Sequence, residues 1–444
     1  MLKTDIKQTV VLSVPIVVGQ LGQLMMSVTD SVMVGRVGTD ALAAAALGNA
    51  VFMLIMIVGI GLSMAVTPLT AIAYGAGRHD ECGIVLRQGL LVNTAAGIVF
   101  CLFTLFVSRF LHLMNQPLQI VGPATVYLRV LGCSMLPIML FQNYRQFSEG
   151  VSILKPAMYI NLLANIVNIL ANWIFIYGNL GMPALGLTGA GIATFSSRSF
   201  MAVCMILAVT RSSQMKPFDP SFRFRRIDFD MMARLLKVGL PMGIQYFFEV
   251  SAFAGASIII GWMGAKELAA HQIALNLASI SFMVVLGIAA AGTIRVGNAV
   301  GKQDVGAVRR AGFTASILCA LFMACAAVIF ISLKRYLPTL YVSDPEVIAI
   351  TASLLIIVAV FQVSDGVQAA GLGILRGMTD MKIPTLITLA AYWVIGLPSG
   401  YLMAFKLKLG VYGVWYGLLL SLTASAVLMM MRFNSKSRDL GNTF

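Results

Sequence analysis

Long apolar stretches constrain this sequence more than any other feature. Windows of about 20 predominantly apolar residues recur along the chain, which is the length a helix needs to cross a bilayer. Only 11% of the 444 residues are charged, whereas a soluble protein carries about a quarter. We therefore predict an all-α membrane protein with twelve transmembrane helices, near residues 10–34, 45–73, 84–107, 120–142, 156–177, 186–210, 236–260, 268–294, 310–333, 346–374, 384–404 and 411–431.

An internal repeat divides these helices into two sets of six. When the chain is shifted by 226 residues against itself, prolines and glycines align at a constant offset, including Pro15 with Pro241 and Gly61 with Gly287. Six is even, so both halves run through the membrane in the same sense, and transport sites lie between or within such halves. We expect pseudo-symmetric lobes at residues 1–210 and 235–444, joined by a cytoplasmic linker at residues 211–234.

The two aligned prolines lie within the first helix of each half. Each proline removes one backbone hydrogen bond and favours a kink. Two interpretations remain open for Pro15 and Pro241: a static bend that packing requires, or a hinge that bends differently in two states.

The basic residues predict the orientation of the chain. The formal net charge is +14, and we count 22 basic residues on the side that holds both termini against seven on the other. The positive-inside rule then places both termini in the cytoplasm. The basic excess indicates topology and attraction to anionic lipid headgroups, and it does not indicate a nucleic-acid partner.

Three carboxylates interrupt the apolar stretches, and the first is Asp30. An ionisable group inside a membrane usually faces a protein interior or a wet cavity and usually has a function. Asn165, Asn168 and Asn172 are spaced three and four residues apart and share one helical face. With Asp30, and with Thr194 as a weaker member, they predict a polar chamber in the first lobe. It is either a cation or proton site or an ordinary interhelical hydrogen-bond cluster.

The other two carboxylates, Glu249 and Asp365, belong to the second lobe. If they meet in one cavity, they cannot both stay ionised and unpaired, so they share a proton or bind a cation such as Na⁺. The neighbouring apolar and aromatic residues suit flat, lipophilic cations, although they also suit a lipid-facing surface. The predicted substrate cavity comprises Tyr246, Phe248, Met283, Phe361 and Gln368.

No motif for enzyme chemistry is present. The sequence has no P-loop, no GxSxG, no HExxH and no Cys/His metal spacing. We therefore expect neither an enzyme nor a cofactor, and a transporter driven by an ion gradient remains. Arg198 also lies mid-span, and the sequence assigns no role to it.

Several sequence runs resemble the multidrug and toxic compound extrusion (MATE) family, in particular its sodium-coupled, NorM-like bacterial branch. The resemblance covers almost the whole chain and rests on Pro15 with VTDSVMVGRVG (28–38), AAHQIALN (269–276), IRVGNAVG (294–301), YRQFSEGVSILKPAM (144–158), NWIFIYG (172–178), ILRGMTDMKIP (374–384) and YWVIGLPSGY (392–401). It implies antiport of organic cations, including dyes and fluoroquinolone antibiotics, against Na⁺ or H⁺.

The resemblance also implies specific sites. The cation site of the second lobe falls on Glu249 and Asp365, and that of the first lobe on Asp30, Asn168 and Asn172. Similar proteins often have a tyrosine four residues before the second aspartate, where this chain has Phe361. Na⁺ ligation there would lack that oxygen, and Phe361→Tyr is expected to tighten Na⁺ binding if residue 361 faces the site.

Two other functions remain as alternatives. A flippase for lipid-linked oligosaccharides would favour a basic central cavity, whereas the buried ionisable groups here are mainly acidic. A passive channel needs no paired lobes with buried acids. We expect a monomer in the bacterial cytoplasmic membrane, with small lipophilic cations and lipids as its partners.

Overall fold

The computed structural model describes residues 2–114, 116–220 and 227–440, so residues 221–226 of the predicted linker and the last four residues lie outside the described part. Twelve helical segments are long and apolar enough to cross a membrane, and each coincides with a predicted span. The predicted all-α, twelve-span fold is therefore confirmed. Nine of the spans are single helices: α1 (Leu2–Gly35), α4 (His79–Ser108), α7 (Lys155–Tyr177), α8 (Gly186–Arg211), α9 (Phe229–Gly261), α10 (Ala265–Gly301), α11 (Val305–Ser332), α12 (Pro345–Gly377) and α15 (Val411–Asp439).

The other three spans are interrupted. The second consists of α2 (Thr39–Ser63) and α3 (Val66–Gly75), and the fourth of α5 (Leu118–Cys133) and α6 (Met135–Gly150). The eleventh alternates α-helix with π-helix: α13 (Lys382–Leu389), η4 (Ala390–Gly396), α14 (Leu397–Tyr401) and η5 (Leu402–Lys406). Pro398 has no N–H to donate, and a wider turn is one way a helix accommodates such a residue. Three short 3₁₀ turns complete the elements, η1 (Leu111–Met114), η2 (Lys216–Phe218) and η3 (Leu337–Leu340).

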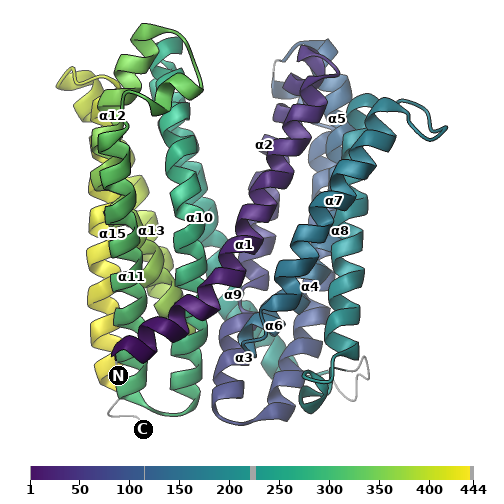
Figure 1. Cartoon of the computed structure of the whole chain (residues 1–444), viewed down its shortest axis with the longest axis vertical. Coiled ribbons are helices and arrows are strands. Elements are labelled where there is room, and N and C mark those ends of the chain that lie inside the picture. The colour runs from purple at the N-terminus through teal and green to yellow at the C-terminus, as the bar shows by residue number, and fades with distance from the viewer. Residues whose placement is uncertain (1, 115, 221–226, 441–444) are drawn as a thin grey trace. The chain divides into compact units, whose positions relative to one another are not determined.

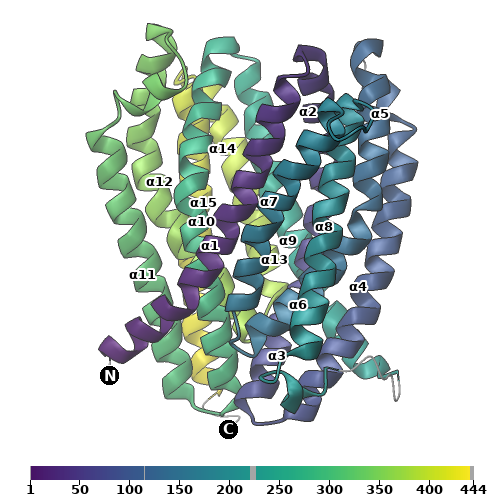
Figure 2. The ribbon, with the colours of Figure 1, turned by 45° about the vertical axis from the view of Figure 1, so that its right-hand side comes forward.

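The chain forms two compact units whose boundaries lie inside α1 and α9. The N-terminal unit comprises Val18–Gly243, and the C-terminal unit comprises Met1–Val17 together with Ile244–Phe444. Each boundary falls two residues after the aligned proline, Pro15 or Pro241. The division expected at residues 211–234 would keep the first helix of each half in its own lobe, whereas here each helix begins in one unit and ends in the other. The beginning of α1 and the end of α15 lie at the same end of the C-terminal unit (Figures 1 and 2).

Glycines allow close helix contacts at both boundaries. A Cβ atom built on Gly61 of α2 would lie 2.4 Å from the Cα atom of Gly243, and one built on Gly287 of α10 would lie 2.4 Å from the Val17 side chain. Gly61 and Gly287 are aligned partners in the internal repeat. In each unit, a glycine of a neighbouring helix therefore packs against the residue two positions after the aligned proline.

The start of α1 is also fixed electrostatically within the C-terminal unit. Arg295 of α10 forms an ion pair with Asp5. The Arg295 guanidinium also donates to the Asp5 carbonyl oxygen at 2.9 Å and to Thr9 Oγ1 at 2.7 Å. These contacts explain why the first turns of α1 belong to the C-terminal unit.

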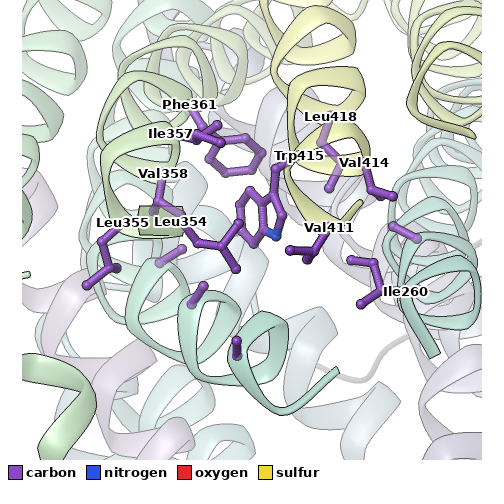
Figure 3. Close-up of a cluster of buried hydrophobic side chains, with 14 of the residues drawn as sticks. Ile260, Leu354, Leu355, Ile357, Val358, Phe361, Val411, Val414, Trp415 and Leu418 are labelled. Carbon is purple, nitrogen blue, oxygen red and sulfur yellow. The ribbon is translucent and has the colours of Figure 1, made fainter. Parts of the chain in front are cut away.

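The core of the C-terminal unit is built around α12, which packs against α10, α11 and α15 (Figure 2). Its largest buried side chain is Trp415, which lies in a cluster of apolar residues from α12, α15 and the end of α9 (Figure 3). In the N-terminal unit, α8 packs against α5, α6 and α7. These helices carry Asp365, Asn168, Asn172 and Thr194, whereas Asp30 lies on α1 and Glu249 on α9.

Candidate functional site

Asp30 lies in a polar cluster within the N-terminal unit. Asn172 Nδ2 donates to Asp30 Oδ1 at 2.6 Å, and Thr194 Oγ1 donates to Asp30 Oδ2 at 3.4 Å. The Asn172 amide also donates to Asn168 Oδ1 at 3.1 Å. The structure thus brings together Asp30 of α1, two asparagines of α7 and one threonine of α8.

The pattern of α7 explains why its asparagines point inward. Asn161, Asn168 and Asn172 are buried, whereas Ile166 and Ile169 between them are exposed on the opposite face. A polar stripe cannot face hydrocarbon without unsatisfied groups, so the helix turns this stripe toward protein.

Asn165 takes no part in the cluster around Asp30. Its side chain donates instead to the Asn161 carbonyl oxygen of its own helix at 2.9 Å. The chamber therefore uses two of the three predicted asparagines.

Three residues of this cluster were not predicted from the sequence. Arg198 interacts electrostatically with Asp30 and donates to Ser134 Oγ at 2.6 Å. Tyr127 also interacts with Asp30, and its hydroxyl lies 3.4 Å from Asn49 Oδ1. The mid-span position of Arg198 was the only signal in the sequence, because Tyr127 and Asn49 lie among apolar residues without a distinguishing spacing.

Glu249 and Asp365 come together in the C-terminal unit. Glu249 lies on α9 and Asp365 on α12, each side chain is 8% exposed, and the two carboxyl groups interact electrostatically. Gln245, one turn before Glu249, donates to Glu249 Oε2 at 2.7 Å. Neither carboxyl group forms an ion pair with a described residue, so both remain available to a proton or a cation.

Neutral and basic side chains surround this acid pair. The Gln368 amide of α12 lies toward Glu249, and neither of its buried polar atoms forms a hydrogen bond of ordinary geometry with a described residue. Arg376 interacts electrostatically with Glu249, and its guanidinium donates to the Tyr246 hydroxyl at 3.2 Å. The Arg376 Cζ atom lies 5.6 Å from the centre of the Tyr246 ring. Tyr246 therefore lies beside the acid site and pairs with a cation already in the chain.

Phe361 lies in the apolar cluster of the C-terminal unit. It is 2% exposed, and its ring contacts Trp415 at 5.4 Å and Phe253 at 6.3 Å between centres (Figure 3). The structure therefore places it among aliphatic and aromatic side chains. Its membership of a substrate cavity stays a prediction, to which we return in the Discussion.

The remaining predicted cavity residues are half-buried. Phe248 contacts the Phe247 ring at 6.2 Å, and its carbonyl oxygen accepts from Trp393 Nε1 at 3.1 Å. Met283 lies on α10. Both are accessible in part, which a substrate surface requires.

The composition of the acid site limits how it can hold a metal ion. Among the described residues, no group of three or more His, Cys, Asp or Glu side chains lies close enough to bind one ion. Glu249 and Asp365 can supply carboxylate oxygens, and hard cations prefer oxygen ligands. An ion such as Na⁺ would need neutral oxygens from this chain or from water to complete its coordination.

The chain has twelve spans and a repeat of two six-helix halves, with a buried acid pair in one unit and the half-buried Asp30 in the other. Such intramembrane acids and repeated halves are typical of membrane transporters. The model of the MatE family matches residues 15–174 and again residues 241–402, so its two matches begin at the aligned prolines. The chain belongs to the MatE family of membrane efflux transporters.

Solved structures share the fold over almost the whole chain. The eukaryotic MATE transporter AtDTX14 is 20% identical, with a TM-score of 0.89 over 99% of this chain and 98% of that chain. An outward-facing multidrug resistance MATE transporter of the MOP superfamily is 21% identical, with a TM-score of 0.91 over 99% and 97%. A MATE protein in a bent conformation is 22% identical, with a TM-score of 0.91 over 100% and 98%. At these identities the likeness shows the fold.

Proposed function

We propose that the chain is an antiporter that exports organic cations in exchange for Na⁺ or H⁺, with Glu249 and Asp365 as its coupling site. The observation that carries the proposal is the pair of buried carboxyl groups, which interact within one unit and form no ion pair with a described residue. The NorM-like resemblance favours Na⁺ as the coupling ion.

The physical reason is the cost of buried charge. Two neighbouring carboxylates in a low-dielectric interior repel each other, so at least one binds a proton or the pair binds a cation. A cationic substrate relieves the same repulsion when it approaches the pair. Ion and substrate therefore compete for one negative site, and this competition is what antiport requires.

The surroundings of the acid pair favour a flat, lipophilic cation. Tyr246 already contacts the Arg376 guanidinium through its ring face and hydroxyl. An organic cation with an aromatic or alkyl body could use the same ring through cation–π contact. Phe248, Met283 and Gln368 are the further candidates for this surface.

Asp30 is a second candidate ion site. Its carboxylate accepts hydrogen bonds from Asn172 and Thr194, which support the charged form, and Arg198 supplies a nearby positive charge. Asn168 Nδ2 and Asn172 Oδ1 are buried without a hydrogen-bond partner in the described part of the chain. These unused atoms offer one donor and one acceptor to an incoming ion or substrate.

Alternating access would act through α1 and α9, the helices that run from one unit into the other. Pro15 and Pro241 lie two residues before the unit boundaries, which favours the hinge interpretation over a static bend. Similar MATE structures have been described in a bent and in a straight conformation. We expect both termini in the cytoplasm of a bacterial cell and a monomeric transporter.

The experiment that tests this function is dye efflux from proteoliposomes with Na⁺ and H⁺ gradients imposed separately. We expect wild-type efflux with one of the two gradients, and Glu249→Gln and Asp365→Asn should nearly abolish it. An amide keeps the shape of the side chain but can neither release a proton nor carry a full negative charge.

Glu346→Gln is the matched control, because Glu346 is exposed and pairs with Lys266 outside the site. It should retain wild-type efflux. Gradient-driven efflux at the wild-type rate in both Glu249→Gln and Asp365→Asn, with normal insertion, would refute the coupling site.

A further inference from the structure

The eleventh span holds a buried phenol that forms no hydrogen bond with any residue that the structure describes. Tyr392 is 1% exposed, and its hydroxyl has no partner among the described residues. A buried hydroxyl without a partner costs free energy, so such a group in a native structure calls for an explanation. A ligand or a second protonation state of a neighbour would supply that partner.

The backbone around Tyr392 is itself unusual. The residue lies in the π-helical segment η4, and single π turns are frequent at functional sites. The next residue, Trp393, donates its indole N–H to the carbonyl oxygen of Phe248 at 3.1 Å. Phe248 directly precedes Glu249. This hydrogen bond therefore holds the helical turn that contains Tyr392 against the helical turn that contains Glu249.

The hydroxyl lies within electrostatic reach of both acids. Tyr392 interacts with Glu249 of α9 and with Asp365 of α12, and its ring is held by Phe253 at 6.0 Å between centres. Asp365 accepts no hydrogen bond from a described residue. The Phe253 ring, one turn after Glu249, also lies 6.3 Å from the ring of Phe361, one turn before Asp365. The unused donor and the carboxyl group that lacks a donor thus belong to neighbouring turns of one buried cluster.

We infer that Tyr392 is a positioning residue of the acid pair, whose hydroxyl donates to the carboxylate that becomes charged when the coupling ion leaves. This inference rests on the proposed function and adds a residue to it.

The other charged groups near the site are few. Arg376 of α12 interacts with Glu249 and donates to the Tyr246 hydroxyl. Helices α13 and α15 pack against η4, and their charged residues, Lys382 and those after residue 431, lie at the helix ends. The net charge of the acid site is therefore set by Glu249, Asp365 and Arg376.

Tyr392→Phe tests the inference, because it removes the hydroxyl and keeps the ring. A hydrogen bond to a charged acceptor corresponds to roughly a tenfold change in the protonation equilibrium. We expect the pH midpoint of proton-driven efflux to rise by about one unit or, if Na⁺ is the ion, the half-saturating Na⁺ concentration to fall about tenfold, because the ion-free carboxylate loses its donor. Tyr401→Phe is the matched control, since Tyr401 is on the same span and 45% exposed, and it should change neither value.

Further variants distinguish failure of this inference from failure of the proposed function. If both Glu249→Gln and Asp365→Asn keep wild-type gradient-driven efflux, the proposed function itself fails. If Glu249→Gln removes ion dependence while Tyr392→Phe matches the wild type in both pH and Na⁺ dependence, only the present inference is overturned. Should Tyr392→Phe fail to insert, fluorotyrosine at position 392 strengthens the donor and should lower the pH midpoint or change the Na⁺ dependence; an unchanged profile again overturns the inference.

Discussion

The three intramembrane acids differ in the donors that surround them. Asp30 accepts hydrogen bonds from Asn172 and Thr194, Glu249 accepts one from Gln245, and Asp365 accepts none from a described residue. Fewer donors make the charged form less favourable in a low-dielectric site. The acid pair of the C-terminal unit is therefore better suited to repeated uptake and release of an ion than Asp30 is.

A substitution at position 361 tests whether the apolar cluster around Trp415 extends to the acid pair. In the structure the Phe361 ring lies between Trp415 and Phe253, and a hydroxyl buried there without a partner costs about 1–3 kcal/mol. We expect Phe361→Tyr to lower the melting temperature in detergent and to leave the Na⁺ and pH dependence of efflux unchanged.

The control for this prediction is Phe103→Tyr, which adds a hydroxyl to a ring that is 50% exposed and should leave the melting temperature unchanged. A lower half-saturating Na⁺ concentration in Phe361→Tyr would contradict our placement. It would show that the edge of this ring faces the acid pair, as the sequence resemblance implied.

Residue spacing predicted some neighbours of the site and missed others. The three-and-four spacing along α7 indicated one shared face, and two of its asparagines do lie at Asp30. Arg198 and Tyr392 reach their sites through tertiary packing and a π-helical turn, which local periodicity does not encode. Sequence reasoning therefore found the residues on regular faces and not those placed by irregular backbone.

At the scale of single helices, α1 and α9 are built alike. Each has a proline within the helix, and two residues later it changes from one compact unit to the other. At the change in α9 Gly61 of α2 allows a close helix contact, and at the change in α1 Gly287 of α10 does so. The repeat in the sequence predicted the paired prolines. It did not predict the change of unit within each helix, because apolar periodicity does not indicate which unit a helical turn packs against.

Gly61→Ala tests the close approach. The added Cβ would lie 2.4 Å from Gly243 Cα, which is backbone and cannot rotate away, and overpacking of this kind costs about 1–3 kcal/mol. We expect a lower melting temperature in detergent and slower efflux. Gly122→Ala is the matched control, because a Cβ there meets nothing within 4 Å, and alanine favours a helix over glycine by about 0.5–1 kcal/mol. Equal melting temperatures for Gly61→Ala and the wild type would contradict the contact.

At the scale of the whole chain, the length of the apolar stretches was enough to predict all twelve spans. The breaks within the second, fourth and eleventh spans were not predicted, because the stretches remain apolar through them. Orientation rests on the distribution of Lys and Arg alone, with 22 on one side and seven on the other.

Cysteine labelling tests that orientation. In a variant without the six native cysteines, Ser213→Cys in the linker should react only with a reagent that enters the cytoplasm. Ser343→Cys, in the connection between α11 and α12, should react with an impermeant reagent outside the cell. The reverse pattern would overturn the cytoplasmic placement of the termini.

The contact between Asp5 and Arg295 has a consequence for how the protein is made. The two residues are 290 positions apart, so a ribosome that adds about 20 residues per second finishes Arg295 about 15 s after Asp5. Throughout that interval the first turns of α1 are in the membrane or at its surface without the helix that later holds them. The first turns of α1 are thus made well before the residue of α10 that fixes them.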